Sequence, residues 1–199
     1  MGKKAVDAVV LPDEAMTGKA IETNADLVKR FGEKIVLNKK NGLPHISLAM
    51  GCVDEKNVIS VERVLRSITK ELSLGEFKVL GVQVSKNAAG EKVSAFEVER
   101  TKELQLLHET VMERLEPYLS NEVSAEEIDD DEVAVTTLLW IKNYREKSSF
   151  GKFSPHITIG YGELSNLPAF PIKFTASRLA LCHLGNHCTC RRVLASVEL

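Results

Sequence analysis

The sequence contains no apolar run long enough to cross a membrane and no excess of positive charge. A helix that spans a bilayer needs about 18 or more consecutive apolar residues, and no stretch of the 199 residues approaches that length. The formal net charge is −2, whereas domains that bind long nucleic acids are usually strongly basic. We therefore expect no membrane partner and no extended nucleic-acid surface, so that any nucleic-acid substrate binds locally.

Cysteine is scarce, and its context is typical of reduced thiols. The four cysteines are Cys52, Cys182, Cys188 and Cys190. The chain begins Met1-Gly2-Lys3-Lys4-Ala5-Val6, a start that leads into a strand rather than into the apolar segment of a signal peptide. We therefore expect a cytoplasmic protein without a disulfide framework.

The segment from Cys182 to Cys190 holds three of these cysteines together with His183 and His187, so zinc has to be considered. The segment lacks the paired Cys-x2–4-Cys arms of most zinc sites, and strand alternation would send several of its ligands to opposite faces. A hairpin with small buried thiols is the favoured interpretation, and structural zinc is the alternative.

The composition is that of an ordinary globular protein with room for a sizeable core. Hydrophobic residues make up 44% of the chain and charged residues 27%, and no Pro-, Gly- or Ser-rich linker separates one part from another. We expect one domain over residues 1–199, built from two intimately packed lobes, and a monomer.

Apolar periodicity predicts helices intermixed with hairpins. The predicted strands cover residues 5–11, 35–37, 45–53, 77–85, 92–99, 156–161, 172–184 and 190–197, and the predicted helices cover residues 20–31, 58–72, 104–115 and 133–144. The expected turns are Asn41-Gly42, Asn87-Ala88-Ala89-Gly90 and Gly185-Asn186, the first joining strands 35–37 and 45–53 into a hairpin. The fold class is therefore α+β, with mainly antiparallel strands and helices packed outside.

Acidic residues precede two of the predicted helices. Asp54 lies just before the helix at residues 58–72, where its carboxylate is expected to cap the helix or favour its dipole. The run from Glu126 to Glu132 ends a polar loop ahead of the helix at residues 133–144. Acidic residues at a helix start are favourable without a metal, so a metal site there is the weaker alternative.

The most informative feature is a short internal echo. Pro44-His45-Ile46-Ser47-Leu48 recurs as Pro155-His156-Ile157-Thr158-Ile159, which separates the two histidines by 111 positions. In a strand, side chains at i and i+2 share a face, so each histidine is expected to point with its Ser or Thr while the isoleucine points into a core. An approximate two-fold relation between the strands would bring two imidazoles and two hydroxyls to one cleft.

Such a constellation can cleave a phosphodiester without a cofactor. One neutral imidazole takes a proton from the nucleophile, and the other, protonated, gives one to the departing alkoxide. Histidine suits both tasks because its unperturbed pKa is about 6.5. The hydroxyls of Ser47 and Thr158 can hold the non-bridging phosphate oxygens, although such groups often bond to backbone instead. A single strand histidine is usually structural, and it is the matched pair, His45 and His156, that indicates catalysis.

The two motifs resemble those of the 2H phosphoesterase superfamily, specifically its 2′-5′ RNA ligase-like and cyclic phosphodiesterase branch, whose signature is a pair of His-x-Ser/Thr motifs. The opening Leu11-Pro12-Asp13-Glu14-Ala15 also resembles that branch, and the similarity covers nearly the whole chain. The resemblance implies a bilobal α+β fold with pseudo-two-fold symmetry and a central cleft. It also implies that His45 and His156 are acid/base catalysts and that Ser47 and Thr158 bind phosphate.

The leading hypothesis for function is a metal-independent phosphodiesterase that acts on a nucleotide or an RNA end by water attack on a 2′,3′-cyclic phosphate. Ligation is the chemical reverse, so a 2′-5′ RNA ligase is an alternative that the same histidines would serve. A nucleotide-binding regulatory module with little turnover is the alternative from another class. Intact histidines in both motifs argue against the module.

Further candidate contacts lie around the second motif. Aromatic residues alternate there with basic ones, namely Trp140, Tyr144, Phe150 and Phe153 with Lys142, Arg145, Lys147 and Lys152. Phe153 and Lys152 are candidate substrate-binding residues in a stacking and phosphate-attracting rim, the alternative being core packing and solvated charges. Tyr161, further along the second motif strand, is a candidate cleft-facing aromatic, because strand alternation is expected to place it on the side of Thr158.

Overall fold

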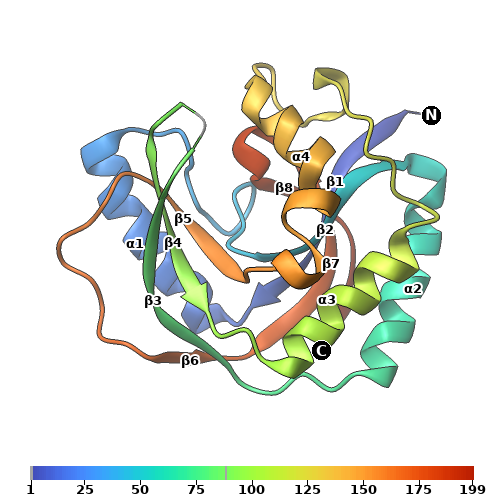
Figure 1. The fold of residues 1–199 in the computed structure, drawn as a ribbon, viewed down its shortest axis with the longest axis horizontal. Coiled ribbons are helices and arrows are strands. Elements are labelled where there is room, and N and C mark those ends of the chain that lie inside the picture. The colour runs from blue at the N-terminus through green and yellow to red at the C-terminus, as the bar shows by residue number, and fades with distance from the viewer. Residues whose placement is uncertain (1, 88) are drawn as a thin grey trace.

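Two four-stranded antiparallel sheets form the framework of the protein, as a computed structural model that describes residues 2–87 and 89–199 (Figure 1). The strand order is β2-β1-β7-β8 in the first sheet and β5-β4-β3-β6 in the second. The strands are β1 (Lys3–Pro12), β2 (Ile46–Asp54), β3 (Phe77–Lys86), β4 (Lys92–Val98), β5 (His156–Tyr161), β6 (Ile172–Phe174), β7 (Ala176–Leu184) and β8 (Cys190–Glu198).

Helices cover these sheets from outside. They are α1 (Glu14–Phe31), α2 (Val58–Glu71), α3 (Lys102–Leu115) and α4 (Val135–Lys147), with short 3-10 helices η1 (Glu55–Asn57), η2 (Ala125–Glu127), η3 (Phe150–Lys152) and η4 (Asn186–Cys188). The predicted α+β class with mainly antiparallel strands is confirmed. No helix in the described part of the chain is both long and apolar enough to span a membrane.

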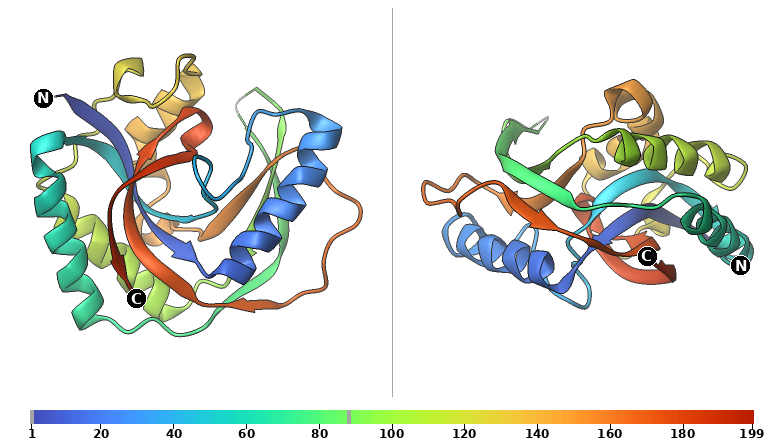
Figure 2. Two further views of the ribbon diagram at one scale, coloured as in Figure 1. Left: turned by 180° about the vertical axis from the view of Figure 1, so that it is seen from behind. Right: turned by 90° about the horizontal axis from the view of Figure 1, so that it is seen from below.

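The two halves of the fold exchange helices. The helix α1 follows β1 of the first sheet but packs on β5 of the second, and α3 follows β4 of the second sheet but packs on β2 of the first. Figure 2 shows α1 lying over the strands of the second sheet. Both exchanged helices are capped at their starts, since Asp13 accepts from the Met16 N–H at 2.9 Å and Thr101 from the Leu104 N–H at 3.2 Å. In this exchange, the unit formed by β1, α1 and β2 corresponds to the unit formed by β4, α3 and β5.

The predicted strand at residues 35–37 is wrong, and so is its hairpin with the first motif strand. The motif strand β2 pairs with β1 instead. The carboxamide of buried Asn24 in α1 holds the 35–37 segment, because Nδ2 donates to the Ile35 carbonyl at 2.9 Å and Oδ1 accepts from the Leu37 N–H at 2.8 Å. These bonds satisfy the backbone as a ladder would. The turn near Asn41 does form, closed by a bridge between Asn38 and Gly42.

The predicted strand at residues 172–184 is divided between the sheets. Its first part, β6, pairs with β3 of the second sheet, and its second part, β7, pairs with β1 of the first. At the break, the Asp13 carboxylate accepts hydrogen bonds from the Thr175 N–H at 2.7 Å and hydroxyl at 3.1 Å. The N-cap of α1 therefore also fixes the crossing between sheets. The closing hairpin of β7 and β8 is confirmed.

Two expectations about acidic residues are corrected. Asp54 does not cap α2, because the 3-10 turn η1 intervenes and Asp54 makes no side-chain cap bond. Helix α4 begins at Val135 with no acidic residue in its first turn. Asp129 and Asp130 instead form ion pairs with Arg192 and Arg191 of β8, each at 2.6 Å. The turn predicted at residues 87–90 closes with a bond from Gly90 N–H to the Asn87 carbonyl, while Ala88 lies outside the described residues.

Candidate active site

The strands that carry the two histidine motifs lie beside each other. Strand β2 is one edge strand of the first sheet, and β5 is one edge strand of the second. The two strands approach one another. Figure 1 shows both near the centre of the molecule. The pairing order of each sheet thus places its motif strand at the boundary where the sheets meet.

The strand alternation expected from the sequence is present in both motifs. His45 and Ser47 are half-buried, as are His156 and Thr158, whereas Ile46 and Ile157 are fully buried. Each isoleucine anchors its strand in the core, which leaves the imidazole and hydroxyl on the opposite face. The two motifs therefore present the same functional groups in the same order.

Both imidazoles are held by the same backbone contact. The Nδ1 of His45 lies 2.7 Å from the Leu43 carbonyl, and the Nδ1 of His156 lies 2.8 Å from the Ser154 carbonyl. A carbonyl can only accept, so Nδ1 carries the hydrogen in each ring and Nε2 is left for chemistry. In both motifs a proline separates the carbonyl residue from the histidine, Pro44 in one and Pro155 in the other, and its fixed φ restricts the bend that makes the contact.

The hydroxyls of Ser47 and Thr158 do not follow the alternative expectation that they bond to backbone. Neither the Ser47 nor the Thr158 hydroxyl donates to a backbone carbonyl within the described ranges 2–87 and 89–199, unlike those of Thr23 or Ser67, which do so at 2.8 Å. The Ser47 hydroxyl approaches the carboxyl of Asp7.

A β-bulge follows each motif at the same place. In the β1–β2 ladder Ser47 faces Val9 and Ala49 faces Ala8, which leaves Leu48 without a partner. In the β4–β5 ladder Thr158 faces Ala95 and Gly160 faces Ser94, which leaves Ile159 without a partner. Each unpaired residue comes three positions after its histidine, and bulges of this kind re-aim the side chains that follow.

The helix exchanged from the other half reaches each bulge. Asn24 of α1 donates from Nδ2 to the Ile159 carbonyl at 2.8 Å. The Nδ1 of buried His108 in α3 approaches the Leu48 carbonyl without reaching hydrogen-bond geometry. Gly160 permits the first contact, because its φ is +135° and a Cβ there would lie 2.9 Å from the Asn24 amide. No sequence pattern marks either helix residue, since each contacts a strand far from it in the sequence.

Burial favours the neutral form of both motif imidazoles. It lowers the pKa of His45 to about 4, an effect that the Leu43 carbonyl opposes and the nearby charge of His156 reinforces. Burial also lowers the pKa of His156, against the Ser154 carbonyl. Both imidazoles are therefore easier to keep neutral than to charge. A bound phosphate anion would shift the balance towards an imidazolium.

Asp7 is a candidate site residue that the sequence motifs do not include. It lies on β1 with a fully buried side chain, and its Oδ2 is 3.8 Å from the Nε2 of His45. Within residues 2–87 and 89–199 neither carboxyl oxygen has a hydrogen-bond partner in proper geometry. Burial raises the pKa of this carboxyl well above its usual value, against the Ser47 hydroxyl and the backbone N–H groups of Ala49 and Leu48. The interruption of the apolar run Ala5–Leu11 by one acidic residue was the only sequence signal.

Tyr161 lies on the face of Thr158, but for a different reason than simple alternation. Three positions separate the two residues, so a regular strand would place them on opposite faces. The bulge at Ile159 adds one residue to β5 and so returns Tyr161 to the face of Thr158. Their partners on β4, Ala95 and Val93, are two positions apart and share a face. The Tyr161 hydroxyl lies 3.2 Å from the Nδ1 of His187.

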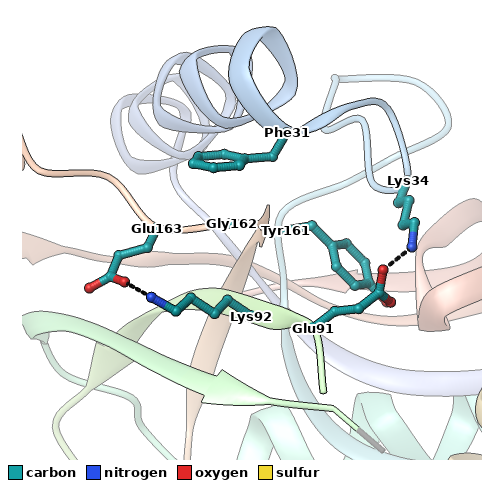
Figure 3. Close-up of a pocket in the computed structure, with 7 residues that line it drawn as sticks. All are labelled: Phe31, Lys34, Glu91, Lys92, Tyr161, Gly162 and Glu163. Atoms are coloured by element: carbon teal, nitrogen blue, oxygen red, sulfur yellow. Dashed lines mark hydrogen bonds and ion pairs between the residues drawn. The ribbon is translucent and has the colours of Figure 1, made fainter. Parts of the chain in front are cut away.

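A pocket of about 430 Å³ opens beside Tyr161 (Figure 3). Its lining comes from the end of α1, the β3–β4 hairpin and the end of β5, and consists of Phe31, Lys34, Glu91, Lys92, Tyr161, Gly162 and Glu163. The Lys34 ammonium lies 5.1 Å from the centre of the Tyr161 ring. Both lysines are paired, Lys34 with Glu91 and Lys92 with Glu163, so the lining balances its charges.

The rim expected ahead of the second motif is only partly at the surface. Phe153 is 3% exposed and stacks on His108 with ring centres 3.9 Å apart, so its proposed contact with substrate is corrected to core packing. The Lys152 ammonium donates to the Glu146 carbonyl at 2.9 Å, at the end of α4. Tyr144 is also buried, whereas Trp140 is 48% exposed. Contact between Lys152 and substrate stays a prediction.

The Cys/His segment forms the turn between β7 and β8, and its imidazoles diverge. His183 bonds through Nε2 to the Glu127 carbonyl at 2.8 Å, while His187 faces Tyr161. Cys182 and Cys190 are buried thiols and Cys188 is half-buried. Among residues 2–87 and 89–199, no three His, Cys, Asp or Glu side chains are grouped to hold a metal. The Leu43 N–H donates to the Cys190 carbonyl at 3.1 Å, which ties this turn to the residue that orients His45.

Comparisons with known proteins support the fold. No protein-family model and no curated protein matches the sequence. Among solved structures, E. coli LigT in its apo form matches with a TM-score of 0.50 and 12% identity, over 100% of this chain and 99% of that chain. E. coli LigT complexed with phosphate matches with a TM-score of 0.49 and 11% identity over the same shares. The likeness to the apo structure shows that the protein has a LigT-like α+β fold.

Proposed function

We propose that the protein is a metal-independent phosphodiesterase that hydrolyses 2′,3′-cyclic phosphates or related RNA-type phosphodiesters. The observation that carries this proposal is the matched presentation of His45 and His156. Each ring is fixed through Nδ1 by the carbonyl two residues before it, on adjoining edge strands, and each has a hydroxyl beside it on the same face. Two imidazoles in one tautomer and two hydroxyls suffice for in-line displacement at phosphorus.

The reaction needs one neutral and one protonated imidazole. The neutral Nε2 removes a proton from water as its oxygen forms a bond to phosphorus, and the protonated Nε2 gives its proton to the ribose oxygen as that P–O bond breaks. Ser47 and Thr158 donate hydrogen bonds to the non-bridging oxygens and hold phosphorus between the rings. Tyr161 and the pocket beside it would receive the nucleoside part of the substrate.

The same site could run in reverse as a 2′-5′ RNA ligase. Microscopic reversibility requires that the acid of one direction is the base of the other, so the histidine pair favours neither direction. The net charge of −2 favours small or terminal substrates over long RNA. We further propose that the protein acts as a cytoplasmic monomer of one domain over residues 1–199, with two packed lobes.

Turnover assays with chelator-treated protein test this proposal. Its substrates are 2′,3′-cyclic nucleotides, 2′-5′-linked oligonucleotides, and RNA that ends in a cyclic phosphate, alone or with a 5′-hydroxyl acceptor strand. We expect a nucleoside monophosphate or an opened RNA end, and joined strands would indicate the ligase. Tight binding of cyclic nucleotide without any product would contradict an enzyme and favour a nucleotide-binding module.

A further inference from the structure

Two buried side chains reach the motif strands from the helices that the halves of the fold exchange. Asn24 of α1 donates from Nδ2 to the Ile159 carbonyl at 2.8 Å. The Nδ1 of His108 in α3 faces the Leu48 carbonyl. Ile159 and Leu48 each come three positions after their histidines and are the unpaired residues of the two bulges. Asn24 and His108 therefore meet equivalent points of the two motif strands.

Each of these side chains also holds the segment that leads into the other motif. The Oδ1 of Asn24 accepts from the Leu37 N–H at 2.8 Å, eight positions before the first motif histidine. The Nε2 of His108 accepts from the Phe150 N–H at 2.8 Å, six positions before the second motif histidine. Asn24 therefore connects the bulge of the second motif with the approach to the first. His108 connects the bulge of the first motif with the approach to the second.

His108 holds the approach to the second motif by more than one contact. Its ring stacks on Phe153, with ring centres 3.9 Å apart and an angle of 1° between the planes. Phe153 is followed by Ser154, whose carbonyl orients the Nδ1 of His156 at 2.8 Å. Phe150 has a φ of 54°, a conformation that a residue with a side chain keeps only where its surroundings hold it. The placement of the His156 imidazole therefore depends on that of His108.

These contacts fix the position of the hydrogen on the His108 ring. A backbone N–H can only donate, so the Nε2 that receives the Phe150 N–H carries no hydrogen, and the neutral ring has its hydrogen on Nδ1. Burial lowers the pKa of His108 to about 4, so the ring is neutral near neutral pH. Within residues 2–87 and 89–199 this Nδ1 has no partner in proper geometry. A buried donor without a partner is unfavourable, which draws the ring and the Leu48 carbonyl towards each other.

We propose that His108 is a positioning residue that sets the spacing of the His45 and His156 imidazoles, with Asn24 as its counterpart in the other half. This inference rests on the proposed function and deepens it. In-line displacement needs both Nε2 atoms within hydrogen-bond reach of one phosphodiester. The two motif strands belong to different sheets, so hydrogen bonds within a sheet do not set the distance between the rings. Asn24 and His108 each contact both motif segments, and together they resist a change in that distance.

Steady-state kinetics on the best cyclic-phosphate substrate test this inference. His108→Phe keeps a flat ring against Phe153 and removes both nitrogens, so kcat should fall at least about tenfold with KM within about threefold of wild type. His108→Gln can still accept from the Phe150 N–H and should recover part of the lost kcat. His183→Phe is the matched control, because it also removes a buried imidazole bonded to backbone, and it should leave kcat unchanged. A folded His108→Phe variant with kcat within about threefold of wild type, or an equal loss in His183→Phe, overturns the inference.

Nitrogen-15 spectra of the histidine rings keep the inference testable without turnover and, in the wild type, without any folded variant. The wild-type His108 ring should carry its hydrogen on Nδ1, and a hydrogen on Nε2 overturns the inference. In His108→Phe the ring signals of both His45 and His156 should move, whereas His183→Phe should move neither. Motif signals that stay at their wild-type positions in folded His108→Phe also overturn it. These spectra need no substrate, so they separate failure of this inference from failure of the proposed function.

Discussion

Asn24 of α1 donates a hydrogen bond of 2.8 Å to the carbonyl of Ile159, so a helix from the first half of the chain holds the bulge of the second motif strand. The two residues are 135 positions apart in the sequence. The bulge determines which face Tyr161 occupies after Thr158. The buried amide of Asn24 is therefore part of the framework that orients the candidate site.

Asn24→Ala should lower both stability and activity. The substitution leaves the carbonyls of Ile35 and Ile159 and the N–H of Leu37 without their partner. We expect the free energy of unfolding to fall by about 3 kcal/mol, because each buried backbone group without a partner costs about 1 kcal/mol or more. Urea unfolding measures the change. Asn143→Ala is the control, since that amide bonds one carbonyl of its own helix near the surface, and a comparable loss there would contradict the assignment.

His45→Ala and His156→Ala should each lower turnover by at least about a hundredfold, the lower end for loss of a positioned acid or base. Ser47→Ala and Thr158→Ala should have smaller effects, because each removes one contact to phosphate and no proton transfer. Initial rates on the best cyclic-phosphate substrate provide the comparison, with circular dichroism as the check on folding. A folded histidine variant that keeps nearly wild-type turnover would rule out the two-histidine mechanism.

The pH dependence of kcat/KM should be bell-shaped, because one imidazole must be neutral while the other is protonated. Burial lowers the pKa of both His45 and His156, so whichever imidazole acts as the base stays neutral below the usual value of about 6.5 and is protonated only as the pH falls further. The acid limb should therefore have its midpoint below about pH 6.5. Rates between about pH 4 and 10 test this. A profile that rises continuously into the alkaline range would remove the general-acid role.

Exhaustive treatment with chelator should leave turnover unchanged, because imidazoles and hydroxyls supply the acid, the base and the phosphate contacts without a cation. Elemental analysis of the same sample should find no stoichiometric metal at the Cys182–Cys190 turn. Activity that is lost on treatment and restored by zinc or manganese would contradict this expectation.

Local pattern predicted most elements of the fold but not all of their partners. The motif strand at residues 45–53 was recognised from its alternation, and the structure has β2 at Ile46–Asp54. Its pairing with β1 rather than with residues 35–37 was not predicted. The side chain of Asn24 forms the backbone hydrogen bonds of the 35–37 segment, and this contact follows no local pattern in the sequence. Similarly, the break at Thr175 depends on Asp13, which lies 162 positions away.

The sequence by itself determined the chemistry that the site can offer. The repeated order of proline, histidine, isoleucine and hydroxyl residue fixes which side chains share a face, since alternation is a property of the strand alone. It also brings each Nδ1 to the carbonyl two residues before it, a contact within one short segment. Such local relations need no knowledge of the rest of the chain.

Only the tertiary structure decided how the two copies of the motif differ. Asp7 stands out in the sequence only as an acidic residue in an apolar run, and Val93 does not stand out at all. Their contrast arises from strand register, which sets Asp7 opposite Met50 and Val93 opposite Tyr161. Register depends on the bulges, and the bulge of the second motif strand is held by a side chain from the opposite half of the molecule. The burial that raises the pKa of Asp7 and lowers that of His45 is likewise a sum over all elements packed around them.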